Sequence, residues 1–85
     1  MRDNMIRYYT LEYFEPVNGH YRYLYRIPEN HPGFITTDAP SDAMKWKTEK
    51  EAQEYLDEHG FKAAFHVQAM LTDDEHILDN WNEKH

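Results

Sequence analysis

The tyrosines of this chain are concentrated in one segment, and arginines lie among them. Six of the seven tyrosines fall between Tyr8 and Tyr25. Tyrosine rings and arginines on an open sheet can stack on nucleic-acid bases and bind phosphates. The same residue types are enriched in protein–protein interfaces. A structural explanation is that tyrosine favours strands and fills a core poor in aliphatic side chains. The candidate residues of this sheet face are Tyr21, Arg22, Tyr23, Tyr25 and Arg26.

A second candidate surface is acidic. The chain carries 9 basic and 16 acidic side chains, and the whole net charge of −7 arises from residues 36–85. Carboxylates on a small rigid body can imitate nucleic-acid phosphates and steer the protein to a basic partner. In size and charge the chain resembles the small acidic inhibitors that phages use against nucleases and restriction or CRISPR effectors. The structural alternative is a solvated, solubilising surface. The candidate residues are Asp73, Asp74, Glu75, Asp79 and Glu83.

Residues for catalysis or metal binding are poorly represented. The chain contains no cysteine, which excludes disulfides and thiolate chemistry. Its six histidines show none of the short spacings of metal ligands. Ser41 is the only serine and lacks the pattern of a nucleophile elbow. Three glycines do not suffice for a phosphate-binding loop. We therefore expect a protein that is not an enzyme and that needs neither metal nor cofactor.

Composition also limits location and partners. No apolar run approaches the roughly 18 residues of a membrane helix, and residues 1–10 lack the apolar core of a signal peptide. We expect one domain spanning residues 1–85, cytoplasmic and not bound to membranes. The negative charge disfavours general binding to nucleic acid.

A hairpin is predicted in the N-terminal part. Residues 5–14 are rich in strand-forming side chains, and residues 20–27 alternate in character. Asn18-Gly19 is typical of a two-residue turn, which would place Glu15 opposite Arg22 as an ion pair across the strands.

Two properties of this hairpin stay open at this level. Pro16 lies close to the turn, and a longer loop would shift the pairing. One face of the second strand is predicted to lie under a helix and the other to be exposed. Strict alternation puts Tyr21, Tyr23, Tyr25 and Ile27 on one face and Arg22, Leu24 and Arg26 on the other.

The clearest predicted element is a helix over residues 49–59. Residues 48–51, Thr-Glu-Lys-Glu, form a capping box at its start. Gly60 is suited to the left-handed position that ends a helix. An apolar stripe at helical spacing comprises Ala52, Tyr55, Leu56 and His59.

Further elements flank this helix. Residues 34–37 predict a third short strand, and residues 43–47 predict extended structure with Trp46 turned inward. Residues 61–71 alternate as a half-buried strand, whose apolar face would hold Phe61, Ala63, Phe65, Val67, Ala69 and Leu71. A second capping box at residues 72–75 predicts a short acidic helix that ends near Trp81. Two states of residues 72–85 stay open at this level: a helix loosely docked through Trp81, or a helix that frays.

This order of elements predicts a small α+β domain with an antiparallel sheet and helices on one side. Our first functional hypothesis is a stoichiometric binder or inhibitor, encoded by a phage or mobile element, of a larger basic host defence protein that handles nucleic acid. One alternative is a binder of nucleotides or single-stranded nucleic acid that uses the tyrosine and arginine face. Another is a structural accessory protein that forms a homodimer through that face.

Overall fold

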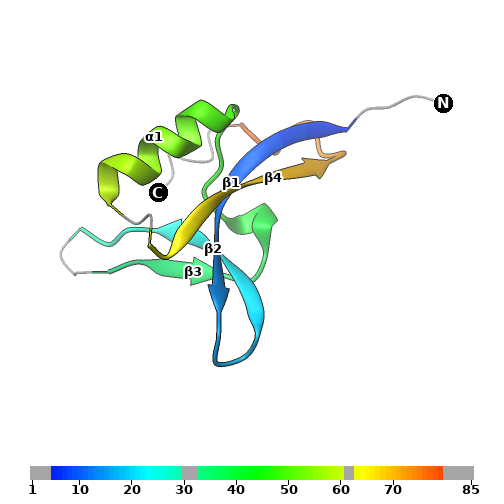
Figure 1. The fold of residues 1–85 in the computed structure, drawn as a ribbon. Helices are drawn as coiled ribbons and strands as arrows, with labels where there is room; N and C mark the ends of the chain where they lie inside the picture. Colours follow the sequence, from blue (N-terminus) through cyan, green and yellow to red (C-terminus); the bar gives the residue numbers. More distant parts are fainter. Residues whose placement is uncertain (1–4, 30–32, 61–62, 80–85) are drawn as a thin grey trace.

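The computed structural model describes residues 5–29, 33–60 and 63–79. They form a four-stranded antiparallel sheet, in the order β3-β2-β1-β4, with one α-helix and a 3-10 turn, which confirms the predicted α+β fold (Figure 1). The elements are β1 (Ile6–Glu15), β2 (His20–Arg26), β3 (Ile35–Thr37), η1 (Pro40–Asp42), α1 (Glu49–His59) and β4 (Phe65–Thr72).

Helix α1 has the bounds that its end signals predict. Thr48 Oγ1 accepts a hydrogen bond from Glu51 N at 3.1 Å, which satisfies one of the free N–H groups of the first turn. Gly60 follows the helix with a φ of 73°, which glycine adopts without strain. Ala52 and Leu56 are buried, and α1 packs through this stripe on β4 and β1 (Figure 1).

The loop between β1 and β2 is longer than predicted. Residues 16–19 form it, so that Glu15 pairs with His20. The prediction of a two-residue turn, and with it the pair between Glu15 and Arg22, was wrong. The register differs by two residues, and each side chain near the turn therefore keeps its predicted face.

The Glu15 side chain explains the wider loop. Its carboxylate accepts hydrogen bonds from Asn18 N at 2.8 Å and Val17 N at 3.0 Å, while Gly19 N donates to Glu15 O at 2.9 Å. The backbone bond from Asn18 is also the main reason why the pKa of Glu15 lies below its ordinary value. Pro16 lacks an N–H group and could not continue the strand ladder.

Strand β2 contains one additional residue at Tyr25. The register against β3 shifts between Leu24 and Arg26, and such a bulge reverses the alternation of the side chains that follow it. Ile27 accordingly packs against the core that contains Leu24. The prediction that Ile27 shares a face with the tyrosines was wrong for this reason.

Strands β1 and β2 are paired only near the hairpin loop and diverge farther on, where β1 follows β4 and β2 follows β3 (Figure 1). Residues 43–46 close the resulting gap. Met44 N donates to Leu24 O at 3.0 Å, and Trp46 exchanges two backbone hydrogen bonds of 2.9 Å with Tyr9. The predicted extended structure is thus confirmed, with the Trp46 side chain packed against the core.

The core lies between α1 and the sheet. Its buried members are Leu11, Leu24, Met44, Ala52, Leu56 and Phe65. Aromatic side chains complete it, because the rings of Tyr13, Phe34 and Phe65 contact one another with centroids 4.8 to 6.0 Å apart. The Trp46 ring lies 5.0 Å from that of Tyr55. Rings thus supply apolar area that aliphatic side chains would otherwise bury.

Strand β4 deviates from the predicted alternation. It begins at Phe65, whereas residues 63–64 form a turn and residues 61–62 lie outside the described ranges. Phe65 is buried, but Leu71 is 57% exposed. The predicted burial of Leu71 was wrong, because the end of β4 extends past α1 (Figure 1).

The predicted C-terminal helix is not formed within its described part, because residues 73–79 make turns. Thr72 Oγ1 accepts a hydrogen bond from Asp74 N at 3.2 Å, and the Asp74 carboxylate accepts one from His76 N at 2.9 Å. These local bonds replace the predicted capping bond, in which Glu75 N would donate to Thr72 Oγ1. Threonine and aspartate side chains that bind nearby backbone in this way favour turns over helix.

Candidate interaction surfaces

The sheet face away from the main core presents three polar side chains in a row across three strands. Tyr23 on β2 lies opposite Glu12 on β1, and Glu12 lies opposite His66 on β4. His66 Nε2 donates a hydrogen bond of 2.8 Å to Glu12 Oε1. The cross-strand register therefore brings together a phenol, a carboxylate and an imidazole that are far apart in sequence.

Glu12 is the buried member of this row, and its carboxylate affects the pKa of Tyr23. Glu12 is only 8% exposed, and the hydrogen bond from His66 gives its buried carboxylate a polar partner. Burial raises the pKa of Tyr23, and the nearby Glu12 carboxylate raises that pKa further. The row thus anchors the centre of the sheet face, with a fixed carboxylate that orients an exposed histidine.

In the Glu12→Gln variant, we expect the pKa of Tyr23 to fall toward its ordinary value, because the neighbouring negative charge is removed at nearly constant shape. The pKa of Tyr55, which burial raises on α1, serves as the internal control and should not change. A pH titration of ¹³C-labelled tyrosine by NMR separates the two rings. Equal changes at both rings, or none at Tyr23, would contradict this account of the row.

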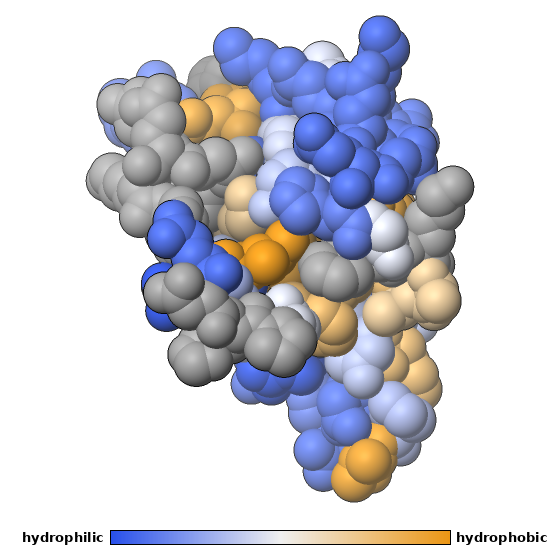
Figure 2. Space-filling model, turned by 90° about the vertical axis from the view of Figure 1, so that its left-hand side faces the viewer, coloured by the Kyte–Doolittle hydropathy of each residue, from blue (hydrophilic) through white to orange (hydrophobic). Residues whose placement is uncertain are grey.

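The hairpin end of the sheet exposes apolar side chains. Phe14 and Tyr21 face each other across the strands with ring centroids 5.2 Å apart, and they are 48% and 50% exposed. Val17 in the loop is 86% exposed. Figures 1 and 2 show this end as a narrow projection from the body with hydrophobic surface at its tip. We call Phe14, Val17 and Tyr21 the hairpin tip.

The candidate tyrosines and arginines of β2 lie on two different faces of the sheet near the hairpin loop, as strict alternation predicts. Tyr21 and Tyr23 share one face, whereas Arg22 lies on the other and binds β3. The Arg22 guanidinium donates to Thr36 Oγ1 at 2.7 Å and to Thr36 O at 3.1 Å, and it forms an ion pair with Asp38. Arg22 is therefore occupied in joining two strands. Of the two remaining members, Tyr25 lies at the bulge, half-buried, and Arg26 is exposed.

The acidic candidates are exposed on the turns after β4. Asp73, Asp74, Glu75 and Asp79 all lie at the surface, whereas Glu83 and Trp81 lie outside the described residues. Asp79 accepts a hydrogen bond of 2.8 Å from His76 and raises the pKa of that histidine. Further exposed carboxylates lie on α1, at Glu49, Glu51, Glu54, Asp57 and Glu58.

Lys45 is an unusual feature that the sequence did not reveal. It is 2% exposed, and its ammonium donates to Ala43 O at 2.7 Å and Ser41 O at 2.8 Å. Nζ also lies 5.8 Å from the centre of the Tyr8 ring. Burial lowers the pKa of Lys45 to about 8, although Asp42 and Asp74 oppose this shift. Lys45 is buried because residues 43–46 close the gap between β1 and β2, and no local pattern predicts such an insertion.

No group of three or more histidine, aspartate or glutamate side chains in the described ranges is placed to hold a metal ion. No helix there is long and apolar enough to cross a membrane. Comparison with known proteins identified no matching family model, no similar curated protein and no similar solved structure.

Proposed function

We propose that this protein acts by binding a larger protein with a basic surface, and that the hairpin tip is its principal contact. The observation that carries the proposal is the exposure of Phe14, Val17 and Tyr21 together on a projection. Soluble proteins lose little by exposing single apolar side chains, but a cluster of them on a projecting element is typical of interaction sites.

The hairpin tip is suited to insertion into a partner. Two rings held in an edge-to-face contact bury large apolar area at low entropic cost when they enter a pocket. The Glu15 carboxylate accepts hydrogen bonds from two N–H groups of the loop, and these bonds preorganise the hairpin tip before binding. The hydrophobic core does not include these residues, so the fold leaves them available.

Charge supports a basic partner. The net charge of −7 and the exposed carboxylates of α1 and of residues 73–79 produce a negative field around the body. Such a field accelerates association with a positively charged surface and makes the complex sensitive to salt. We therefore propose a stoichiometric binder. Binding would inhibit the partner if the basic surface that is covered is the partner's own functional site.

The test is a quantitative capture experiment with three baits. In the first variant, Val17→Asp and Tyr21→Ser change the hairpin tip. In the control variant, Met5→Ser and Leu71→Ser change two residues that are similarly exposed at the opposite end of the sheet. We expect one protein from the source cell to be recovered stoichiometrically by the wild type and the control, and to be reduced about thirtyfold with the hairpin variant.

Mass spectrometry and circular dichroism complete this experiment. Equal recovery of the protein by all three folded baits would contradict the proposal. Recovery of nucleic acid alone would also contradict the proposal, and it would favour the alternative of a nucleic-acid binder. Loss of the protein with both variants would show that the hairpin tip has no special role.

A further inference from the structure

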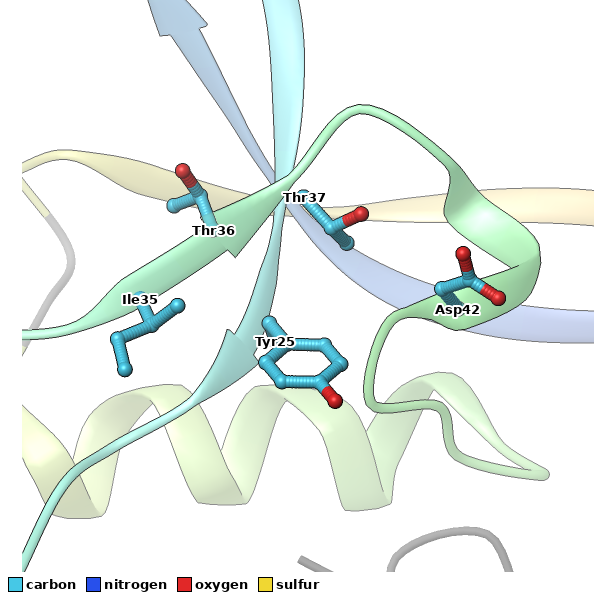
Figure 3. Close-up of a pocket in the computed structure, with 5 residues that line it drawn as sticks. All are labelled: Tyr25, Ile35, Thr36, Thr37 and Asp42. Atoms are coloured by element: carbon cyan, nitrogen blue, oxygen red, sulfur yellow. The ribbon is translucent and has the colours of Figure 1, made fainter.

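A shallow pocket lies at the β3 edge of the sheet and shares no residue with the hairpin tip. Its volume is about 330 Å³, which is at the lower end of the range for small-ligand sites. Residues of β2, β3 and η1 line it, namely Tyr25, Ile35, Thr36, Thr37 and Asp42 (Figure 3). The pocket thus has the size for one side chain or a small fragment.

The lining has an apolar part and an anionic part. Ile35 is 38% exposed, and Figure 3 shows the Tyr25 ring between Ile35 and Asp42. The Asp42 carboxylate is exposed and accepts no hydrogen bond from any other described residue. A long basic side chain matches this arrangement, because its methylene stem can cover Ile35 and Tyr25 while its charged end reaches Asp42.

Among basic groups, the pocket favours guanidinium over ammonium. Guanidinium is planar, binds carboxylates through two parallel hydrogen bonds and stacks on aromatic rings. It is also more weakly hydrated than ammonium and is therefore easier to place against Ile35. Lys45 is near enough to interact electrostatically with Asp42. However, its ammonium is held by two backbone carbonyls, and Lys45 is not a lining residue.

We propose that this pocket binds an arginine side chain of the protein partner. The inference rests on the proposed function, because it names one group on the basic surface of that partner. An arginine bound in this pocket would contact side chains beside β3. The short edge strand β3 would then take part in binding without pairing with a strand of the partner.

The probe is Nα-acetyl-arginine methylamide, added to ¹⁵N-labelled protein and followed by NMR. We expect saturable shifts at residues 25, 35–37 and 42, and affinity about tenfold lower in Asp42→Asn. The matched control, Asp73→Asn, removes the same charge from an exposed acidic residue on the turns after β4 and should bind like the wild type. The citrulline analogue has the shape of arginine without its charge and should not bind.

Three results would overturn the inference: equal weakening in Asp42→Asn and Asp73→Asn, equal binding of the citrulline analogue, or no saturable shift at the pocket. The affinities of the variants for the captured partner distinguish a failure of this inference from a failure of the proposed function. If Asp42→Asn binds the partner with unchanged affinity while the hairpin variant does not, the pocket inference fails and the proposed function stands. Unchanged binding of the hairpin variant contradicts the proposed function itself.

Discussion

Replacing Leu24 with alanine is expected to lower the free energy of unfolding by about 3 kcal/mol. Leu24 is fully buried, and its carbonyl receives the hydrogen bond from Met44 at the point where β1 and β2 diverge. The cavity that Leu24→Ala leaves would remove packing contacts both within the sheet and between the sheet and residues 43–46. A domain of 85 residues has roughly 4 to 13 kcal/mol of stability in total, so the variant should lose a large fraction of it.

Leu71→Ala provides the matched control for this change. The same atoms are removed, but Leu71 is 57% exposed and lies at the end of β4 beyond the helix. We expect a cost below about 0.5 kcal/mol, as for most surface substitutions. Urea denaturation followed by circular dichroism measures both values. Similar costs for the two variants would contradict the placement of the core between α1 and the sheet.

The second large effect concerns Lys45 and pH. The folded state lowers the pKa of Lys45 from 10.5 to about 8, so between these values the unfolded chain binds more protons than the folded one. Stability therefore rises as the pH increases through this interval. Between about pH 7 and about pH 9.5 the gain from Lys45 is about 2 kcal/mol. In Lys45→Met this gain should vanish.

Comparison of variants isolates the contribution of Lys45. Lys47→Met is the control, because Lys47 is exposed next to the same segment. Burial raises the pKa values of Tyr8, Tyr23 and Tyr55 in the folded state, and these three tyrosines are common to all variants. His76 is common to all variants, and its effect cancels in the difference. Urea denaturation at several pH values gives the slopes, and equal slopes for Lys45→Met and the wild type would contradict a buried, protonated Lys45.

The parts of the fold that depend on local chemistry could be predicted from the sequence. The bounds of α1 follow from the Thr48 hydroxyl at one end and Gly60 at the other. The strand segments follow from alternation and side-chain type. Each of these signals acts over a few residues, so no knowledge of the tertiary structure is needed to interpret it.

The predicted two-residue turn and the predicted C-terminal helix were wrong because a side chain binds nearby backbone in each segment. These bonds compete with the structure that the local sequence favours. The Glu15 carboxylate binds two loop N–H groups and displaces the turn that Asn18-Gly19 favours. The Asp74 carboxylate binds His76 N and stabilises a turn where a helix was predicted. The Glu15 and Asp74 side chains carry charge, but their carboxylates also accept hydrogen bonds from nearby backbone N–H groups.

The candidate surfaces required the cross-strand register. The hairpin tip exists because Phe14 lies opposite Tyr21, and a register with a two-residue turn would have separated them. The row of Tyr23, Glu12 and His66 depends on pairing between β1 and β4, which are far apart in sequence. The exposure of Asp73, Asp74, Glu75 and Asp79, in contrast, could be predicted from the sequence, because charged side chains are rarely buried.

The most direct test of the central claim is the dissociation constant of the captured partner, measured by calorimetry with purified proteins at low and at high salt. We expect one-to-one binding that weakens in salt and that weakens about thirtyfold further when Val17→Asp and Tyr21→Ser are introduced. The Met5→Ser and Leu71→Ser control should bind like the wild type. An affinity that is equal for the wild type and the hairpin variant would contradict the claim that the protein acts through its hairpin tip.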